Sequence, residues 1–206
     1  MEEKNKEAAI LRAAEEEFLQ KGYEGAKTVA IARRAGVTHA MLHYYFRSKE
    51  NLYNQVLTTK FDMLVQSVLI SFTRSDLPFL DRLRVGIEAH FDFLVQNPGL
   101  PRFVINELIA DTQQVELLRE RLARMFATVV VPMQEELNTL IEQGVVDRVS
   151  MVDLVVDMVS LNAFVFIAMP IIEPFALQYY APSLEEFLAQ RKRENVELIM
   201  RRLKRS

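Results

Sequence analysis

The stretch AGVTHAMLHYYFRSKENL, residues 35–52, combines a glycine turn with two histidines, three aromatic side chains and two basic side chains. The stretch begins with a predicted turn, Ala35-Gly36-Val37. A short helix is predicted before this turn, at 28–34, and another after it, at 38–45. Thr38 is well suited to begin the second helix, because its hydroxyl can accept a hydrogen bond from an unpaired backbone N–H. Two short helices joined by a turn that contains glycine predict a helix-turn-helix motif.

The residues inside this motif favour close packing of its two helices. Gly36 can adopt a backbone conformation that is costly for other residues. The apolar side chains expected between the helices are Ile31, Ala32, Val37 and Leu42. With that face buried, the opposite face of the second helix stays free. A major groove about 12 Å wide admits an α-helix, so the motif predicts DNA binding through the helix at 38–45.

Basic residues gather around the motif, although the chain as a whole is acidic with a net charge of −3. Residues 21–49 contain six Lys and Arg side chains and one acidic side chain, Glu24, which gives this segment a charge of +5. A basic patch on an acidic protein is the electrostatic footprint expected of a nucleic-acid-binding domain. Without the motif, the same run of charges would indicate only a solvated face beside a core.

The rest of the chain also predicts helix, so the expected fold class is all-α with about nine helices. Apolar residues recur at helical spacing, and there is neither a sustained alternation of period two nor a hairpin turn signal. Further helices are expected at 4–21, 48–73, 76–97, 101–110, 112–142, 150–169 and 183–203, with a kink at Pro132 and a loop at 170–182. Residues 1–47 would form a three-helix DNA-binding domain, and residues 48–206 a larger helical domain.

Composition argues against several other classes of protein. The 206 residues include no cysteine, which excludes disulfides, cysteine-based zinc sites and a thiol nucleophile. There is no glycine-rich phosphate loop and no acid–base set, so neither an enzyme nor a cofactor is expected. His39 and His43 have the spacing of two metal ligands on one helix. No Cys, Asp or Glu completes a ligand set on that face, so no metal site is expected either.

The most apolar run, residues 154–172, is long enough to raise the question of a membrane span. Asp157 and Asn162 interrupt this run and Pro170 breaks it, which favours a buried core or interface helix. The N-terminus is acidic and amphipathic and lacks the apolar segment of a secretory signal. We therefore expect a cytoplasmic protein with no membrane partner.

Three segments resemble the DNA-binding domain of the TetR family of bacterial repressors: ILRAAEEEFLQKGYEGA at 10–26, IARRAGVT at 31–38 and LHYYFRSKENL at 42–52. The resemblance covers about residues 10–57, and beyond them it is one of helical architecture only. It implies a homodimeric regulator, most often a repressor, that a small apolar or amphipathic effector releases from a palindromic operator in double-stranded DNA. The alternative is a helical interaction module that does not bind DNA.

The family pattern implies roles for individual residues of the motif. Residues expected at the DNA are Thr28, Thr38, His39, Ala40, Met41, His43, Tyr44, Tyr45 and Lys49, with phosphate contacts from Thr28 and Lys49. Three positions depart from the pattern, since His39 is often Lys, Met41 often Thr and His43 usually Tyr. No arginine lies on the expected reading face, so the commonest contact to guanine is missing there. The helix is therefore expected to read thymine methyl groups and DNA shape.

The resemblance also implies two roles for the larger domain, dimerisation and effector binding. The helices at 150–169 and 183–203 are the expected dimer interface, because a helix that is apolar nearly all round must be covered on every side. An effector pocket is expected to have an apolar wall with a few polar anchors. Its expected lining is Phe61, His90, Phe103, Asn106, Glu107, Phe126, Asn162 and Phe166. For each aromatic residue in this set, a place in the core is the alternative.

Overall fold

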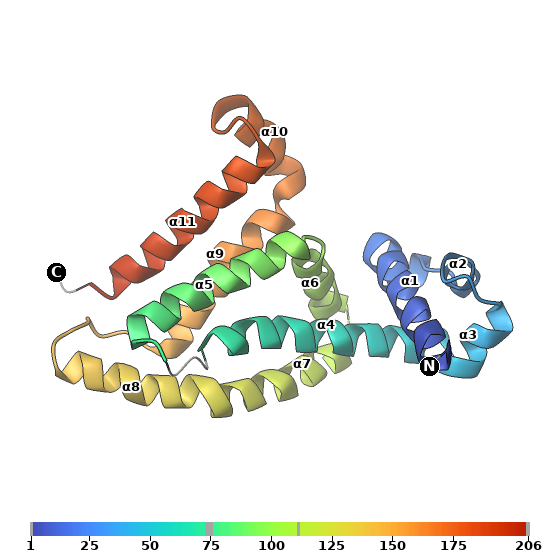
Figure 1. Ribbon diagram of the computed structural model, residues 1–206, viewed down its shortest axis with the longest axis horizontal. Helices are drawn as coiled ribbons and strands as arrows, with labels where there is room; N and C mark the ends of the chain where they lie inside the picture. Colours follow the sequence, from blue (N-terminus) through green and yellow to red (C-terminus); the bar gives the residue numbers. More distant parts are fainter. Residues whose placement is uncertain (1, 73–75, 111, 205–206) are drawn as a thin grey trace. The chain divides into compact units, whose positions relative to one another are not determined.

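The computed structural model describes residues 2–72, 76–110 and 112–204, and every element within them is helical (Figure 1). The predicted all-α fold class is confirmed. The first helices are α1 (Glu2–Gly25), α2 (Thr28–Arg34), α3 (His39–Phe46) and α4 (Lys49–Phe72). They are followed by α5 (Phe79–Gln96), α6 (Leu100–Ala110), α7 (Thr112–Met125), the π-helical turn η1 (Phe126–Val130), α8 (Val131–Glu142), α9 (Met151–Ile167), α10 (Met169–Tyr179) and α11 (Leu184–Arg202).

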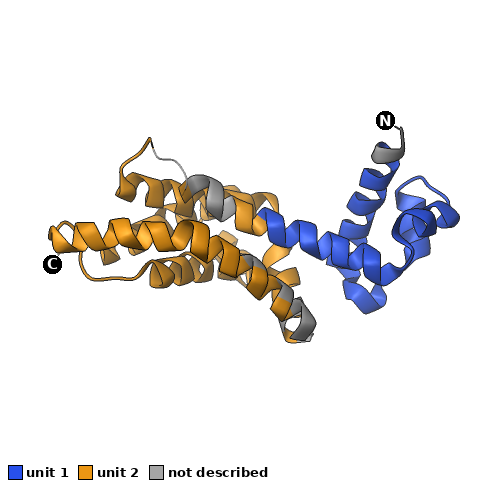
Figure 2. Ribbon diagram, turned by 90° about the horizontal axis from the view of Figure 1, so that it is seen from below, with its two compact units in different colours: residues 1–63 blue, residues 64–206 orange. Residues whose placement is uncertain are grey.

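The chain forms two compact units, residues 1–63 and 64–206, and α4 passes from the first into the second (Figure 2). The first part of α4 belongs to the N-terminal unit because it packs on α1. The ring of Tyr53 lies edge-on to that of Phe18, with centroids 4.8 Å apart, and the buried Lys60 forms an ion pair with Glu15. The boundary set by packing therefore lies beyond residue 47, where the sequence changes from short to long predicted helices.

In the N-terminal unit, helix ends follow local sequence signals. α1 is interrupted at Gly22, where φ is 66°, in the left-handed region that glycine adopts without strain. The Ser48 hydroxyl accepts a hydrogen bond from the Asn51 N–H at 3.0 Å and caps α4. Each of the four helices contributes a fully buried apolar side chain to the core, namely Phe18, Ile31, Leu42 and Leu52.

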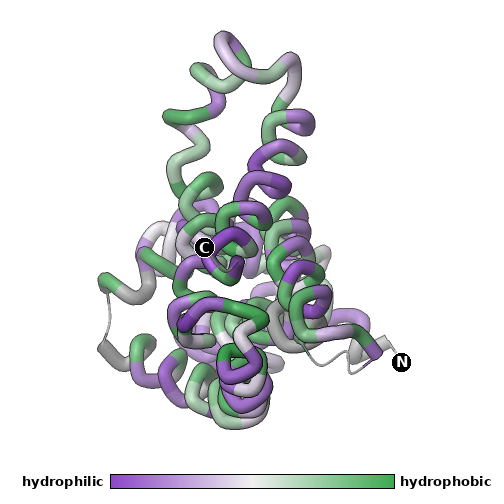
Figure 3. Tube along the Cα trace, turned by 90° about the vertical axis from the view of Figure 1, so that its left-hand side faces the viewer, coloured by the Kyte–Doolittle hydropathy of each residue, from purple (hydrophilic) through white to green (hydrophobic). Residues whose placement is uncertain are grey.

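In the C-terminal unit, α5 packs against both α9 and α11, and α9 also packs against α6, α8 and α10 (Figure 1). One hydrophobic cluster joins α5, α8, α9 and the end of α11 around Leu83 and Leu137. A second cluster joins the other end of α5 to α9, α10 and the start of α11 around Phe91 and Phe166. Apolar and polar segments alternate along the helices in Figure 3, as expected for helices that bury one face.

The predicted helix of 112–142 is continuous, but it contains a π-helical turn. α7, η1 and α8 follow one another without a break, and the Val131 N–H donates to the Phe126 carbonyl, five residues earlier. Pro132 has no N–H, and its ring crowds the carbonyl four residues before it. This accounts for the wider, π-helical turn directly ahead of Pro132, at the place where the sequence predicts a kink.

The segment 170–182 was predicted to be a loop, and this part of the prediction is wrong because most of it lies in α10. Pro170 occupies the first turn of α10, where a missing N–H costs nothing because it would have no partner within the helix. Pro174 lies inside the helix and only Pro182 lies beyond it. With α7, η1 and α8 taken as one helix, the described residues hold ten helices, and the additional one is α10.

α9 is apolar on most of its surface, as its sequence predicts. Leu154, Met158 and Val165 are buried, whereas Val152 and Phe164 remain 46% and 63% exposed in the single chain. Within the described residues, no single helix combines the length and apolar composition needed to cross a membrane. Among these described residues, α9 and α10 taken together are the one pair that reaches that length and composition, and the pair is bent by 82°.

Candidate nucleic-acid interface and effector cavity

The turn between α2 and α3 has the geometry that the sequence predicts for a helix-turn-helix motif. Gly36 has a φ of 70°, which glycine adopts without strain, and the Val37 N–H donates to the Ala32 carbonyl at 3.0 Å. The Thr38 hydroxyl then accepts from the Met41 N–H at 3.2 Å and caps α3. These bonds set the direction in which α3 leaves the turn.

α3 has one buried face and one exposed face. Leu42 and Phe46 lie in the core, with 0% and 4% of their surface exposed. The exposed residues of the helix are His39, Ala40, His43 and Tyr44, and Met41 and Tyr45 are half-buried. Tyr44 keeps 76% of its surface accessible. The residues predicted to read DNA from α3 are therefore placed together, and those predicted to pack the motif lie on its inner side.

The two histidines of α3 are held in defined positions. His43 Nδ1 lies 3.1 Å from the Arg47 carbonyl oxygen, and since a carbonyl only accepts, Nδ1 carries the hydrogen. In the neutral ring Nε2 is then an acceptor, which suits the amino group on the edge of adenine or cytosine. His39 lies edge-on to His43, with ring centroids 4.5 Å apart. Among the described residues, no group of three or more His, Cys, Asp or Glu could hold a metal ion.

The link from α3 to α4 is strained at Arg47. Its φ is 61° and its ψ −46°, and the Ser48 N–H donates to the Phe46 carbonyl at 2.6 Å. Together these features define the form of γ-turn with a positive central φ, which is rare and strained. Strained backbone persists where the surrounding structure holds it. Here the His43 ring binds the Arg47 carbonyl, and the turn leaves the Arg47 side chain exposed.

Thr28 and Lys49, the two predicted phosphate contacts, both have partners within the protein. The Thr28 hydroxyl lies 3.0 Å from His39 Nε2. The Lys49 ammonium group lies 4.6 Å from the centroid of the Tyr23 ring and donates to the Glu24 carbonyl at 3.4 Å. A phosphate contact from either side chain would replace or share these bonds, so both contacts remain predictions.

A buried carboxylate ties α2 to α1 beneath this surface. Glu17 is fully buried, accepts a hydrogen bond from Lys21 Nζ at 2.6 Å and lies 3.6 Å from Arg34 Nη2. The hydrogen bond from Lys21 lowers the pKa of Glu17 below its usual value, and the charge of Arg34 lowers it further. Arg34 also pairs with Glu16 at 2.9 Å. Lys21 and Arg34, two of the basic residues in the segment predicted to bind DNA, therefore form ion pairs within the N-terminal unit.

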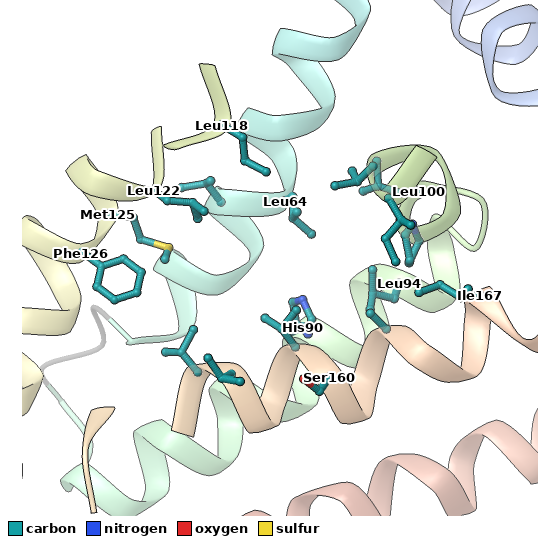
Figure 4. Close-up of a pocket in the computed structure, with 18 residues that line it drawn as sticks. Leu64, His90, Leu94, Leu100, Leu118, Leu122, Met125, Phe126, Ser160 and Ile167 are labelled. Atoms are coloured by element: carbon teal, nitrogen blue, oxygen red, sulfur yellow. The ribbon is translucent and has the colours of Figure 1, made fainter. Parts of the chain in front are cut away.

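The C-terminal unit contains a cavity of about 380 Å³ between α4, α5, α6, α7 and α9 (Figure 4). Its wall is almost entirely apolar, and His90 and Ser160 are the polar residues among those that line it. The apolar lining consists of Leu64, Val65, Leu94, Leu100, Pro101, Val104, Ile105, Leu118, Leu122, Met125, Phe126, Val155, Val156, Val159, Ala163 and Ile167. Cavities of this size and composition suit small organic molecules.

Of the predicted pocket residues, His90 and Phe126 line this cavity, and none of the others with a described side chain does. Phe61 is buried within the N-terminal unit, and Phe166 packs against Phe91, with ring centroids 5.5 Å apart. The remaining side chains are placed as follows: Phe103 is buried outside the lining, Asn106 is exposed, Asn162 is buried behind His90, and the Glu107 side chain lies outside the described residues. Aromatic and polar residues within apolar runs of the sequence therefore do not identify the residues that line the cavity.

The sequence interpretation missed most of the lining because that lining is aliphatic. Leu94, Leu118 and Val155 carry the same helical spacing as core residues, and no local signal separates a wall residue from a core residue. Only the packing of five helices leaves the space between them. Among the polar residues of the predicted set with described side chains, the one that lies in the lining is His90, on the apolar face of α5.

Comparison with known proteins identifies the N-terminal motif. The family model described as "Bacterial regulatory proteins, tetR family" matches residues 10–56. The transcriptional activator FasR of Mycolicibacterium smegmatis is 36% identical over 105 residues, which are 50% of this chain and 48% of FasR. The chain thus spans about half the length of the curated relatives it matches.

Solved structures match nearly the whole chain in fold. A putative transcriptional regulator from Streptomyces coelicolor, SCO4942, has a TM-score of 0.68 at 23% identity, with 97% of this chain and 99% of that chain covered. FadR from Bacillus subtilis, solved in complex with stearoyl-CoA, has a TM-score of 0.68 at 17% identity, with 95% and 98% covered. Identities this low establish the fold alone. Residues 10–56 thus match the DNA-binding domain of the tetR family of bacterial regulatory proteins, and nearly the whole chain shares the fold of solved transcriptional regulators.

Proposed function

We propose that this chain is a transcriptional regulator that binds a palindromic operator as a homodimer and leaves it when a small molecule enters the cavity. The observation that carries the proposal is the exposed face of α3, which stands in a helix-turn-helix matched by a family of regulatory proteins. A two-fold operator offers two half-sites about one helical turn apart. A dimer presents two α3 helices to them, and no catalytic role is proposed.

The proposed reading of DNA divides the residues by their chemistry. Ala40 and Met41 offer only apolar contact, which suits a thymine methyl group, and His43 Nε2 accepts from a base amino group. Phosphate contacts position the protein without reading sequence, and that role is assigned to Thr28 and Lys49. The other proposed DNA contacts are Thr38, His39, Tyr44 and Tyr45.

DNA binding is tested with a labelled fragment from upstream of the chain's own gene, titrated with salt and challenged with random DNA. Saturable binding that survives the competitor, with two subunits per site, is expected. Lys49→Ala should weaken binding to every sequence and lower the salt slope by about one. As a control, Arg119→Ala removes an exposed cation from α7 and should change neither quantity. Unchanged binding by Lys49→Ala would refute the phosphate contact.

Sequence preference is tested on the same fragment by substituting each base pair in turn. His39→Ala, Met41→Ala and His43→Ala should each change which bases are preferred, at a cost of roughly 1–3 kcal/mol on the cognate site. Equal losses on cognate and random DNA would show that these side chains do not read bases. A dominant guanine requirement opposite α3 would contradict the assignment of apolar and acceptor contacts.

The proposed dimer surface lies on α9, α10 and α11, which pack against one another. These helices expose the large apolar side chains Val152, Phe164, Ile171, Phe175, Leu177, Tyr179 and Leu198, and Tyr180 directly after α10 is exposed as well. A groove between the three helices is lined by Phe164, Tyr180 and Phe187, among others. Extended apolar surface of this kind marks interaction sites on soluble proteins. α10 thereby adds to the pair of helices predicted from the sequence.

Sedimentation at micromolar concentration tests this surface. The wild-type chain should sediment as a dimer, and Phe164→Glu, which places a charge where 63% of the ring is exposed, should shift it toward the monomer. Ile109→Glu is the matched control, because Ile109 is 81% exposed on α6 and away from the proposed surface. A dimer that tolerates Phe164→Glu would place the interface elsewhere.

The proposed effector is a small apolar or amphipathic molecule held in the cavity. Because a protein of the same fold has been solved with stearoyl-CoA, long-chain acyl compounds are the first class to screen against the protein–DNA complex. Release of DNA by a compound that binds the cavity is the expected result. Tighter DNA binding with the same compound would contradict the proposed release.

A further inference from the structure

Three buried polar side chains connect the cavity to α11. His90 on α5, Asn162 on α9 and Asn195 on α11 are 1%, 0% and 0% exposed. A buried polar group without a partner is costly, and here each side chain is hydrogen-bonded to the next. In such a series of hydrogen bonds, the partners of each side chain determine which of its atoms donates and which accepts.

The orientation of the Asn195 amide is fixed from two sides. Its Oδ1 accepts from Arg191 Nη2 at 2.7 Å, and a guanidinium group only donates. Its Nδ2 donates to the Leu161 carbonyl at 3.0 Å, and a carbonyl only accepts. Exchanging the oxygen and nitrogen would make both contacts repulsive. The atom that faces Asn162 is therefore Nδ2, which donates to Asn162 Oδ1 at 3.0 Å.

The Asn162 amide is fixed by the same logic. Its Oδ1 accepts from Asn195, and its Nδ2 donates to the Ile87 carbonyl at 3.0 Å. The same Nδ2 lies 3.1 Å from His90 Nδ1 and offers it a second hydrogen. Nδ1 of His90 must then be an acceptor, and a neutral imidazole whose Nδ1 accepts carries its hydrogen on Nε2.

The His90 ring points into the cavity (Figure 4). Among the described residues, its hydrogen-bond partner is Asn162, at Nδ1, and Nε2 has none. Burial lowers the pKa of His90 to about 4, so the ring is neutral at pH 7. A protonated ring would also set a second N–H against the amino group of Asn162. The cavity therefore contains one donor of fixed identity within an almost wholly apolar wall.

We propose that His90 selects effectors that carry a hydrogen-bond acceptor, such as a carbonyl oxygen, on an apolar body. This inference rests on the proposed function only in taking the cavity as the effector site. A hydrocarbon of the same shape leaves the Nε2–H unpaired, and an ammonium group meets it donor to donor. Asn162 acts through His90 and is a positioning residue.

The tautomer can be measured directly in the unmodified protein. The ¹⁵N resonances of the imidazole rings distinguish a hydrogen on Nε2 from one on Nδ1, and the chain has only three histidines. His90→Phe removes one set of signals and so assigns it. We expect the neutral Nε2–H form for His90 at pH 7. The Nδ1–H form, or an average of the two tautomers, would overturn the proposal.

The selectivity is tested with two probes that share one carbon skeleton, butyrophenone and n-butylbenzene. The quantity compared is the ratio of their dissociation constants. The preference for the ketone should be about 3- to 10-fold greater in the wild type than in His90→Phe, which is the worth of one hydrogen bond. Ser160→Ala, which alters the other polar lining residue, should keep the wild-type ratio. A ratio unchanged in His90→Phe, or lost in Ser160→Ala alone, would overturn the proposal.

The outcomes separate this inference from the proposed function. One outcome is that His90 gives a preference for the ketone but neither probe changes operator binding in the assay described above. The inferred ligand class would then be supported, and the proposal that such compounds release the protein from DNA would be refuted. If neither probe binds while operator binding is intact, the ligand class inferred for the cavity is wrong and the DNA-binding function stands. Asn162→Leu, which removes the donor to Nδ1, should abolish the preference in the same way as His90→Phe.

Discussion

The exposed face of α3 and the cavity of the C-terminal unit place polar groups in opposite surroundings. His39 and His43 stand in water, four residues apart on one helix, and each can meet a base or a phosphate without a large desolvation cost. His90 is buried in an apolar wall built from five helices, and it keeps its hydrogen in place only because Asn162, Asn195 and Arg191 support it. A surface site can be specified by a short motif, whereas a buried one needs partners from distant parts of the chain.

The contrast between the two sites predicts that DNA binding can be lost while ligand binding in the cavity is kept. Leu42→Ala should destabilise the N-terminal unit by about 3 kcal/mol, because Leu42 is fully buried and truncating a core leucine leaves a cavity. DNA binding should be lost at temperatures where the C-terminal unit still binds butyrophenone. Arg12→Ala, at an exposed position of α1, should change stability by less than about 0.5 kcal/mol. Simultaneous loss of both activities in Leu42→Ala would show that the two units do not fold independently.

The buried histidine predicts a pH dependence of stability that an exposed histidine would not give. His90 has a folded pKa of about 4 against an ordinary value of 6.5, so between these values the unfolded chain binds a proton that the folded chain cannot. The free energy of unfolding should therefore fall by about 1.4 kcal/mol per pH unit as the pH drops from 6.5 toward 4. Denaturant titrations of the wild type and His90→Gln should differ by this slope, and parallel curves would contradict the burial of a neutral ring.

Glu17 predicts a smaller effect in the N-terminal unit. Its pKa is lowered in the folded state by the hydrogen bond from Lys21, so its stabilising contribution is present above its unfolded pKa and is lost as the pH falls through the lower folded value. Glu17→Gln should cost about 1–2 kcal/mol at pH 7, less than for a fully buried pair because the Lys21 side chain is 47% exposed. The difference from wild type should shrink toward pH 3 in urea unfolding of the two proteins. A constant difference would mean that the charge of Glu17 is not what stabilises α1 against α2.

The smallest effect concerns the strained γ-turn between α3 and α4. Arg47→Gly should raise the stability of the N-terminal unit by about 1 kcal/mol, because glycine accepts a positive φ that costs arginine energy. The same change should weaken DNA binding at low salt, since an exposed cation beside α3 is lost. Calorimetric unfolding and the operator titration measure the two effects on one sample. A variant that is less stable than wild type would show that the Arg47 side chain, and not only its backbone, holds the turn.

Much of the N-terminal unit could be predicted because its signals are local. Gly36, Thr38 and Ser48 each act on bonds within five residues of themselves, and they occur in one short stretch. α10 could not be predicted from its prolines, because Pro170 sits in the one turn of a helix that tolerates it. The cavity lining could not be separated from the core, since Leu94 and Val155 have the same spacing as their buried neighbours. The partners of His90 were out of reach for the same reason, because Asn195 lies 105 residues further along the chain.

The π-helical turn at Phe126–Val130 has a consequence for comparing this chain with its relatives. Such a turn accommodates one more residue than an α-helix over the same path, so the residues on either side of it are out of phase by one position. A relative with an unbroken helix would align with a single-residue gap here, and placing that gap elsewhere would assign Met133 and Leu137 to the wrong face. Phe126, at the start of the turn, lines the cavity. Deleting one residue between 127 and 130 should therefore convert the turn into regular α-helix and keep Met133 and Leu137 on the faces they occupy now, whereas the same deletion within α7 or α8 would rotate the residues beyond it by about 100°.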